Sequence, residues 1–597
     1  MNTQAQVPGS PECVEHLGDV TFLGSYLAHW GREAASAPAV SYHDHSVSRH
    51  GTVQTTTFGE LDLWTRALAA RITELTEPGD RVAILTPQSG EYVAGFLAAM
   101  RTAVINVPLF APDLPGQASR LEAVMADCTP TLVLTTRAKV DLVRAFVAEH
   151  GGLDADRVLC IDDFAGDPDG LASSYIAPSV SMDDVAYLQY TSGSTRLPAG
   201  VVLTHRNLVE NAFQLRAGHR LDFRRETCVS WLPLFHDMGL LIGICGPIIG
   251  GFESVLLDPV AFIIKPRRWL EALDGRREVM TAAPNFAFDY VVKRVKPEDR
   301  AGLDLSGVRG WSNGAEPILP ETLDRFVEAF SANGVVHRAM KPTYGLAEAT
   351  VFVSVTPVDE GPTIIQVDAE RLQHGIADRT PPMNGGRQVP LVSSGTAINQ
   401  LMVIADPDTG RRLADGIVGE IWLRGPNVGQ GYWQKPAESV GVFGATLGDP
   451  GDVPADDWLR TGDLGFLIEG RIFVTGRIKD LIIIDGRNVY PHDVEYTVDA
   501  SHPALAQRRL AAFSVPGPTG ESIVVVAERY KGADVDAAGA QAVAAAARAA
   551  VSQDHAVALH DFVLVEPGTI PWTSSGKIAR AATRTAYLDG ALSVVGG

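Results

Sequence analysis

A chain of 597 residues exceeds the size at which one hydrophobic core keeps growing, so the sequence predicts at least two domains. Its formal net charge of -21 at pH 7, without any compensating basic run, argues against nucleic acid and anionic membrane surfaces as partners. Five scattered cysteines without a CxxC pair argue against a disulfide framework or a cysteine zinc site, and favour a reducing, cytoplasmic compartment.

The first part of the chain alternates short apolar runs with amphipathic stretches, which predicts an α/β domain of layered, largely parallel sheets and helices. The apolar runs are residues 81–85, 131–135, 157–161 and 253–257, and the helical stretches are 59–76 and 319–333. We see no signal peptide at the N-terminus. The most apolar segment, 238–252, is shorter than the roughly 20 residues of a membrane span, so we expect buried core and no integral membrane segment.

The apolar run VAYLQY ends at Tyr190 and opens into a loop of small and hydroxyl residues. This loop contains Thr191, Ser192, Gly193, Ser194 and Thr195, followed by Arg196. Such residues let backbone N–H groups approach phosphate oxygens, and the hydroxyls add donors or a magnesium ligand, so the loop is a candidate phosphate site. A plain surface turn is the alternative. The sequence lacks GxxxxGK[ST], which argues against P-loop hydrolases and kinases.

Four later segments carry residue types suited to nucleotide and acid chemistry. They are LPLFHDMGL (232–240), SNGAEP with KPTYGLAEAT (312–350), WLRTGDLG with GRIKD (458–480) and PWTSSGKIAR (571–580). Taken alone, His236 in the first segment is more typical of a core or turn histidine than of a catalyst, and Lys577 in the last is typical of a solvated lysine.

Residues 355–390 are rich in proline, glycine and charge, which predicts a surface insertion or lobe. The glycines at both ends of 476–488 permit large backbone changes, so this segment is a candidate hinge.

Beyond the hinge, the pattern predicts a separate small α+β domain. Its expected elements are strands over 509–517 and 521–530, an Ala-rich helix over 535–552 and a strand beginning near 562. We therefore expect an N-terminal domain over 1–478 and a C-terminal domain over 479–597.

The phosphate-site loop and the four later segments occur in the order found in the adenylate-forming superfamily, and the chain resembles that superfamily over essentially its whole length. The superfamily includes acyl-CoA synthetases, luciferases and the adenylation domains of peptide synthetases. The resemblance implies a large N-terminal domain, a small mobile C-terminal domain, and ATP and Mg2+ as cofactors.

The resemblance also implies roles for individual residues. It implies that the phosphates are bound by Thr191, Ser192, Gly193, Ser194, Thr195 and Arg196. It implies that the nucleoside is bound by Asn313, Gly314, Ala315, Thr343, Tyr344, Gly345, Asp463 and Arg477. Tyr344 would stack on adenine, Asp463 would accept hydrogen bonds from both ribose hydroxyls, and Arg477 would add a ribose contact. Thr191 and Glu348 would ligate magnesium, which prefers oxygen ligands.

Three further roles follow from the same resemblance. Lys577 would bring a catalytic cation from the small domain, as the meeting of a carboxylate with the α-phosphate requires. His236 would stand at the mouth of an acyl pocket, and Lys479 would be the hinge residue. Trp231, Phe235 and Phe286 would line that pocket, although ordinary core packing is the default for such side chains.

Within the superfamily, three features resemble the fatty acyl-AMP ligases. Arg196 and Ala199 replace the glycine and lysine of the usual loop, and we expect Arg196 to take over the β/γ-phosphate contact. The 355–390 segment stands where these ligases carry an extra lobe thought to restrain the small domain and disfavour CoA, and DGRNVYPHDVE (485–495) resembles that branch. Phe235 is followed by His236 rather than aspartate, which argues against an α-amino acid substrate.

The resemblance thus implies a ligase that activates a medium-chain or long-chain fatty acid to acyl-AMP with release of pyrophosphate. The acyl group would pass to an acyl carrier protein, or to a carrier domain of a polyketide or peptide synthase. A long-chain acyl-CoA synthetase is the nearest alternative, and a non-catalytic nucleotide-binding scaffold is the alternative from another class.

Overall fold

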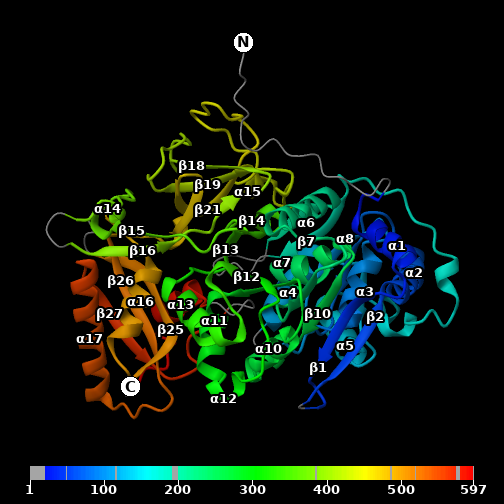
Figure 1. Cartoon of the computed structure of the whole chain (residues 1–597), viewed down its shortest axis with the longest axis horizontal. Coiled ribbons are helices and arrows are strands. Elements are labelled where there is room, and N and C mark those ends of the chain that lie inside the picture. Colours follow the sequence, from blue (N-terminus) through cyan, green and yellow to red (C-terminus); the bar gives the residue numbers. More distant parts are fainter. Residues whose placement is uncertain are drawn as a thin grey trace.

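Short strands alternating with helices assemble into two large sheets in the N-terminal part of the chain (Figure 1). The computed structural model describes residues 20–48, 50–114, 117–190, 199–382, 386–484, 487–517, 520–572 and 578–595. The larger sheet has nine strands, and its six central strands run parallel to one another. In spatial order the strands are β17 (Thr396–Ala397), β14 (Phe352–Val355), β13 (Met340–Gly345), β12 (Val308–Gly314), β11 (Val279–Pro284), β9 (Thr227–Ser230), β10 (Glu253–Leu257), β1 (Pro38–Asp44) and β2 (Thr52–Thr57).

The second sheet has seven strands, of which five are parallel. In spatial order they are β20 (Gly431–Tyr432), β8 (Gly200–Thr204), β7 (Val185–Tyr190), β4 (Ile105–Pro108), β3 (Arg81–Ile84), β5 (Leu132–Thr135) and β6 (Val158–Cys160). The antiparallel strands β8 and β20 continue this sheet from β7. The four apolar runs predicted as strands are therefore confirmed as β3, β5, β6 and β10.

Helices pack between and around these two sheets. They are α1 (Leu23–Glu33), α2 (Phe58–Leu75), α3 (Gly90–Ala99), α4 (Ala118–Cys128), α5 (Val140–His150), α6 (His205–His219), α7 (Asp237–Leu240), α8 (Gly246–Gly250), α9 (Pro259–Ile264), α10 (Arg267–Leu273), α11 (Asn285–Arg294), α12 (Pro297–Arg300) and α13 (Pro320–Phe330). A continuous core of buried side chains joins both sheets through α1, α2, α3, α6 and α8. The predicted helices 59–76 and 319–333 are confirmed as α2 and α13, the latter ending in a 3₁₀ turn.

Local chemistry starts several of these helices. Thr57 before α2 and Thr204 before α6 each form a capping box, in which the threonine hydroxyl accepts from the N3 backbone and the N3 side chain accepts from the threonine backbone. The apolar segment 238–252 forms α7, a π-helical turn over Leu241–Cys245 and α8, and most of it is buried, as predicted. In the described part of the chain, no helix is both long enough and apolar enough to cross a membrane.

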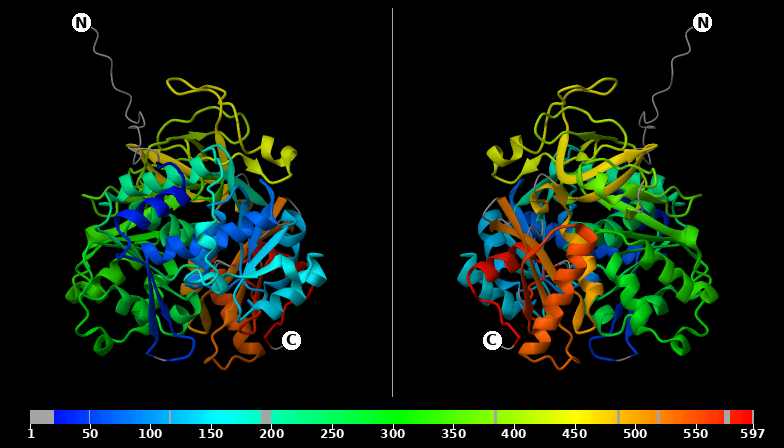
Figure 2. Two further views of the ribbon diagram at one scale, coloured as in Figure 1. Left: turned by 90° about the vertical axis from the view of Figure 1, so that its right-hand side faces the viewer. Right: turned by 90° about the vertical axis from the view of Figure 1, so that its left-hand side faces the viewer.

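A four-stranded antiparallel sheet, drawn in yellow, lies above the two large sheets in Figures 1 and 2. It contains β18 (Leu401–Ala405), β19 (Gly419–Arg424), β21 (Leu459–Ile468) and β22 (Arg471–Arg477), and the short helix α15 (Pro436–Val440) follows β20.

The segment predicted as a lobe forms its own two-stranded sheet and a short helix. These are β15 (Ile364–Asp368), α14 (Ala369–Gln373) and β16 (Gln388–Val392). The predicted boundary at 355 is too early, because Val355 is the last residue of β14 and belongs to the nine-stranded sheet. Buried Lys341 holds the approach to the lobe, since its Nζ donates to the carbonyls of Pro357, Val358 and Glu360 at 2.8–3.0 Å.

The C-terminal part of the chain, orange to red in Figure 1, has its own hydrophobic core. Its elements are β23 (Ile482–Ile484), β24 (Arg487–Val489), α16 (Pro491–Ser501), β25 (Leu505–Gly517), β26 (Gly520–Arg529), α17 (Ala537–His555), β27 (Leu559–Val565) and α18 (Arg580–Leu588). The three predicted strands and the Ala-rich helix are confirmed as β25, β26, β27 and α17. The domain boundary at 478/479 stays a prediction.

Two kinds of contact join the C-terminal part to the rest. Near residue 480, Ile478, Leu481 and Tyr490 belong to an apolar cluster with the lobe and with β21 and β22. At α11 the C-terminal part makes polar contacts: Arg508 Nη2 lies 2.5 Å from Asp289 Oδ2, and Lys293 Nζ donates to Gln507 Oε1 at 2.8 Å.

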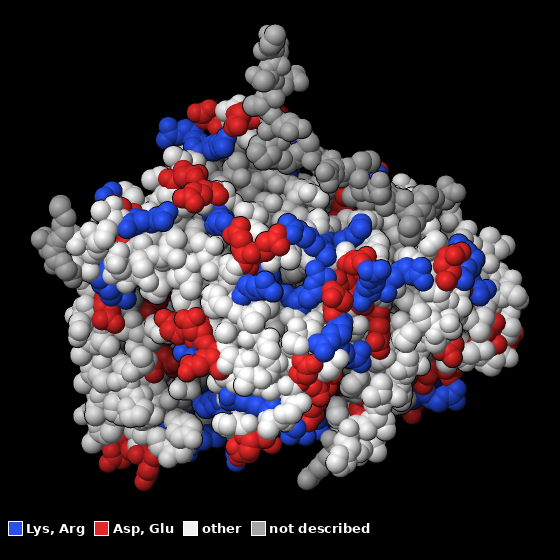
Figure 3. Space-filling model, viewed as in Figure 1, with Lys and Arg blue, Asp and Glu red and all other residues white. Residues whose placement is uncertain are grey.

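Charged side chains of both signs are interspersed over the face drawn in Figure 3. Many of them are paired locally, as Arg325 is with Asp289. Exposed pairs of this kind contribute about 0 to 1 kcal/mol each, so the buried apolar core carries most of the stability.

Candidate active site

The candidate nucleoside residues lie where two neighbouring parallel strands end. Asn313 and Gly314 close β12, with Ala315 next, and Thr343, Tyr344 and Gly345 close β13. Carboxyl ends of parallel strands commonly form ligand sites. Glycine is required at position 345, because a Cβ there would lie 1.8 Å from the Val351 carbonyl, and a Cβ on Gly314 would displace the Thr343 hydroxyl, which lies 2.4 Å from that position. The structure therefore brings these six predicted residues together at one edge of the nine-stranded sheet.

Asp463 connects this edge to the four-stranded sheet. The Tyr344 hydroxyl donates to Asp463 Oδ2 at 2.8 Å, and Arg477 Nε donates to Asp463 Oδ1 at 2.9 Å. Asp463 and Arg477 face each other as partners of β21 and β22. The Asp463 carboxylate raises the pKa of Arg477, and burial raises that of Tyr344, so the carboxylate is surrounded by a permanent cation and a neutral hydroxyl donor.

Glu348, the predicted magnesium ligand, lies in a 3₁₀ turn over Ala347–Ala349 just after β13. Its Oε1 accepts a hydrogen bond from the Tyr432 hydroxyl at 2.9 Å, and its backbone carbonyl accepts from Gly429 N at 2.9 Å. Burial raises the pKa of Glu348, while the Tyr432 hydroxyl opposes that shift. A nearby dication would favour the ionised carboxylate further.

His236 directly precedes α7, and its Nδ1 lies 2.6 Å from Asp237 Oδ1. The neighbouring backbone is tightly packed: Gln189 Nε2 donates to the Phe235 carbonyl at 3.1 Å, and a Cβ on Gly239 would lie 2.0 Å from the Pro233 carbonyl. His236 is 20% exposed, so its imidazole keeps access to solvent or to a ligand.

The three predicted acyl-pocket residues divide between two places. Trp231 is buried, stacks on Phe262 with ring centroids 3.8 Å apart, and meets Phe286 edge to face at 6.3 Å. Phe235 instead packs against Phe110 at 5.0 Å. The stacked Trp231 is thus a core side chain in this structure, and its role in an acyl pocket stays a prediction.

The predicted hinge residue Lys479 lies in a 3₁₀ turn over Ile478–Asp480, between β22 and β23. Burial and the neighbouring Arg477 lower the pKa of Lys479. Arg580 ties the same turn to the C-terminal core, because it pairs with Glu495 at 2.5 Å and lies 3.8 Å from Asp480.

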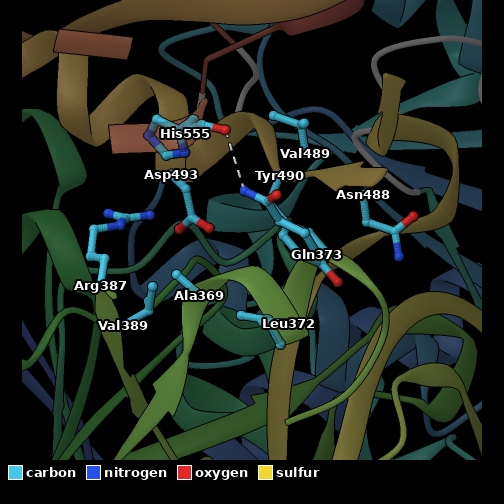
Figure 4. Close-up of a pocket in the computed structure, with 10 residues that line it drawn as sticks. All are labelled: Ala369, Leu372, Gln373, Arg387, Val389, Asn488, Val489, Tyr490, Asp493 and His555. Carbon is cyan, nitrogen blue, oxygen red and sulfur yellow. Dashed lines mark hydrogen bonds between the residues drawn. The ribbon is translucent and has the colours of Figure 1, made fainter. Parts of the chain in front are cut away.

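The lobe meets the C-terminal part at a shallow, open depression (Figure 4). From the lobe it is lined by Ala369, Leu372, Gln373, Arg387 and Val389, and from the C-terminal part by Asn488, Val489, Tyr490, Asp493 and His555. Gln373 Nε2 donates a long hydrogen bond of 3.5 Å to the His555 carbonyl. The lobe therefore touches the segment that follows the predicted hinge.

Several predicted residues lie outside the described part of the chain. They are Thr191, Ser192, Gly193, Ser194, Thr195, Arg196 and Lys577. Tyr432, in contrast, was missed by the sequence reasoning although it contacts Glu348. It stands 84 positions away along the chain, and no local pattern connects the two residues.

Comparison with known proteins gives consistent results. Residues 27–433 match the family model described as AMP-binding enzyme. The chain is 40% identical to the long-chain-fatty-acid–AMP ligase FadD32 of Mycobacterium marinum, over 96% of this chain and 95% of that protein. It is 41% identical to the provisionally named fatty-acid–CoA ligase fadD25 of Mycobacterium tuberculosis, over 91% and 93%.

Among solved structures, one from a study of the fatty acyl-adenylate ligases of E. coli and L. pneumophila superposes with a TM-score of 0.84. The two sequences are 31% identical, and the match covers 98% of that chain and 96% of this one. The agreement extends over both the N-terminal and the C-terminal parts, so the mixed α/β fold predicted from the sequence is confirmed.

Proposed function

This chain belongs to the AMP-binding enzyme family, and from that premise we propose that it is a fatty acyl-AMP ligase. It activates a medium-chain or long-chain fatty acid with ATP, releases pyrophosphate, and passes the acyl group to an acyl carrier protein or carrier domain of a polyketide or peptide synthase. The observation that carries the proposal is the hydrogen-bonded group of Tyr344, Asp463 and Arg477, in which Tyr344 and Arg477 lie at the ends of β13 and β22 and Asp463 lies within β21. Its planar ring, carboxylate and cation suit an adenosine.

The chemistry is an in-line displacement at phosphorus. A carboxylate oxygen of the fatty acid forms a bond to the α-phosphorus of ATP, while the bond from that phosphorus to the pyrophosphate oxygen breaks. Residues Thr191 to Thr195 hold the phosphates through backbone N–H groups and hydroxyls, and Lys577 offsets negative charge where the carboxylate meets the phosphate. Asp463 and Arg477 orient the ribose, and His236 faces the acyl side.

The donor set of Glu348 and Thr191, a carboxylate and a hydroxyl, fits magnesium, which prefers oxygen ligands. When bound, the ion supplies positive charge to the phosphates. The task of Tyr432 is to orient Glu348 through its 2.9 Å hydrogen bond.

For the acceptor, the lobe favours a carrier protein over CoA. Its apolar side chains Ile365, Val367 and Leu372 share a cluster with Tyr490 and Leu481, which follow the predicted hinge Lys479. Such contacts oppose rotation of the C-terminal domain over 479–597, the motion that would admit the acceptor thiol. A cytoplasmic location is consistent with five cysteines that form no CxxC pair.

One experiment tests the adenylation and the acceptor together. The protein is incubated with ATP, Mg2+ and a series of labelled fatty acids, with and without CoA, and the products are identified by mass spectrometry. We expect acyl-AMP and pyrophosphate in every case and little acyl-CoA. Robust acyl-CoA formation would favour the acyl-CoA synthetase alternative.

The variant Lys577→Ala distinguishes a catalytic ligase from a non-catalytic nucleotide-binding scaffold. We expect it to lower pyrophosphate release by at least about 100-fold, the range observed when a single transition-state contact is removed. ATP binding should persist, because the nucleoside residues are unchanged. A variant as active as the parent would contradict the role of Lys577, and a parent that binds ATP but releases no pyrophosphate would favour the non-catalytic scaffold.

A further inference from the structure

The two ends of the phosphate-site loop meet at a single point. Tyr190, the last residue of β7, and Gly200, the first residue of β8, face each other as strand partners. The Tyr190 side chain is 5% exposed and lies against Gly200, where a Cβ would stand 2.9 Å from the Tyr190 ring. The position of this one tyrosine therefore determines where the loop begins and returns.

Helix α4 holds Tyr190 at two atoms. The Tyr190 hydroxyl donates to Asp127 Oδ2 at 2.6 Å, and Arg120 Nη2 donates to the Tyr190 carbonyl at 3.4 Å. Arg120 and Asp127 are seven residues apart, which places them on one face of the helix. Burial raises the pKa of Tyr190, so its hydroxyl stays a donor to the carboxylate.

The C-terminal end of α4 is hydrogen-bonded to β3. Arg81 Nε donates to the Cys128 carbonyl at 3.0 Å, and Arg81 Nη2 donates to the Thr129 carbonyl at 2.8 Å, which satisfies carbonyls that the helix leaves unpaired. Arg120 and Asp127, which bind Tyr190, therefore lie on a helix that is hydrogen-bonded to β3.

A second segment contacts Asp127 and Gly200. Lys435 Nζ lies 3.4 Å from Asp127 Oδ1, and Trp433 N donates to the Gly200 carbonyl at 2.7 Å. In the same segment Tyr432 donates to Glu348. Residues 429–435 therefore connect the base of the phosphate-site loop with the predicted magnesium ligand.

We propose that Tyr190 and Asp127 are positioning residues for ATP, which act by holding the base of the phosphate-site loop against α4 and the segment 429–435. This inference rests on the proposed function for the identity of the ligand. A loop that binds phosphate through backbone N–H groups gains affinity when those groups are aimed in advance, because fewer conformations are lost on binding. Loosening its base lowers affinity for ATP before it alters the acyl site.

Tyr190→Phe tests this with the loss of one oxygen atom. A hydrogen bond to a carboxylate is worth roughly tenfold in a binding constant, so we expect the dissociation constant and the KM for ATP to rise about tenfold. The kcat at saturating ATP and the KM for fatty acid should stay within about twofold. Asp127→Ala should act at least as strongly, and Asp127→Asn, which keeps an acceptor oxygen, should act less.

Tyr587→Phe is the matched control, because the Tyr587 hydroxyl also donates to an aspartate, Asp561, at 3.1 Å in the C-terminal part. It should leave the ATP constants unchanged. Thermal unfolding without ligand should show Tyr190→Phe within a few degrees of the parent, which separates positioning from a general loss of stability.

The inference is overturned if Tyr190→Phe and Asp127→Ala bind ATP as the parent does, or if Tyr587→Phe weakens binding equally. Equilibrium ATP binding by calorimetry is measured separately from acyl-AMP formation. A parent protein that binds ATP but makes no acyl-AMP contradicts the proposed function alone, whereas one that does not bind ATP contradicts both proposals.

Discussion

At the scale of single residues, the candidate site depends on two carboxylates, each paired with a tyrosine hydroxyl. Tyr344 donates to Asp463 and Tyr432 donates to Glu348, at 2.8 and 2.9 Å. A hydroxyl donor orients a carboxylate without neutralising it, so the negative charge remains for a ribose or a cation. Both tyrosines therefore serve the geometry of the site.

We predict that Tyr432→Phe raises the Mg2+ concentration needed for half-maximal adenylation by about 10-fold, the loss typical when a residue that orients a metal ligand is removed. Titration of pyrophosphate release with Mg2+ at saturating ATP measures the change. Tyr175→Phe, which removes a hydroxyl bonded to the Arg101 carbonyl, is the control and should not shift the titration. An unchanged titration in Tyr432→Phe would show that Tyr432 does not orient the magnesium ligand Glu348.

At the scale of elements, the chain enters and leaves the lobe at one place. Ile364 and Val392 are strand partners of β15 and β16, and Ser393 N donates to the Thr363 carbonyl at 2.9 Å. The chain thus leaves and re-enters the body at adjacent points, so residues 364–392 can be replaced by a two-residue Gly turn without stretching it.

We predict that this excision increases acyl-CoA formation at least several-fold, because the apolar contacts that oppose rotation of the C-terminal part are lost. Leu372→Ala, which only weakens the same contacts, should give a smaller increase. Acyl-AMP formation in each variant is the internal control and should stay near that of the parent. If acyl-AMP forms normally while acyl-CoA does not rise, the lobe is not the barrier to CoA.

Elements were readable from the sequence where their signals are local. The helix α2 was predicted from its amphipathic periodicity, and the buried strands β5 and β10 were predicted from their continuous apolar runs. The candidate nucleoside residues at the ends of β12 and β13 could be named from the sequence because they belong to contiguous motifs.

Contacts between distant segments were not readable. Tyr432 with Glu348 and Tyr190 with Asp127 are separated by 84 and 63 positions, and each depends on how separate elements pack against one another. For the same reason the sequence treated Trp231, Phe235 and Phe286 as one set, whereas packing divides them between two parts of the core. Periodicity identifies which side chains are buried and not which neighbour each one meets.

At the scale of the whole molecule, buried histidines make stability depend on pH. Burial lowers the pKa of His205 to about 4 and that of His219 to about 3, against about 6.5 in an unfolded chain. The contribution of these neutral rings to the free energy of unfolding is fully present above pH 6.5. It is lost as the pH falls from 6.5 toward 4, because the unfolded chain takes up protons that the folded protein does not.

We predict that the free energy of unfolding falls by about 2 kcal/mol per buried histidine between pH 7.5 and 5. Urea unfolding at several pH values measures this, and His205→Gln with His219→Gln should flatten the dependence even if it lowers stability throughout. His374→Gln, at an exposed position, is the matched control. A double variant with the slope of the parent would contradict the assignment.

The junction between the C-terminal part and the rest has two chemically different edges. Apolar side chains pack beside Ile478 and Tyr490, and charged side chains make the contacts at Arg508 and Lys293. Water and salt compete with the charged contacts but strengthen or leave unchanged the apolar ones. The ionic strength of the medium therefore acts on one edge of the junction only. As the ion content of the cell changes, we therefore expect the C-terminal part to separate from α11 first, while its apolar contacts near residue 480 stay closed and act as the pivot.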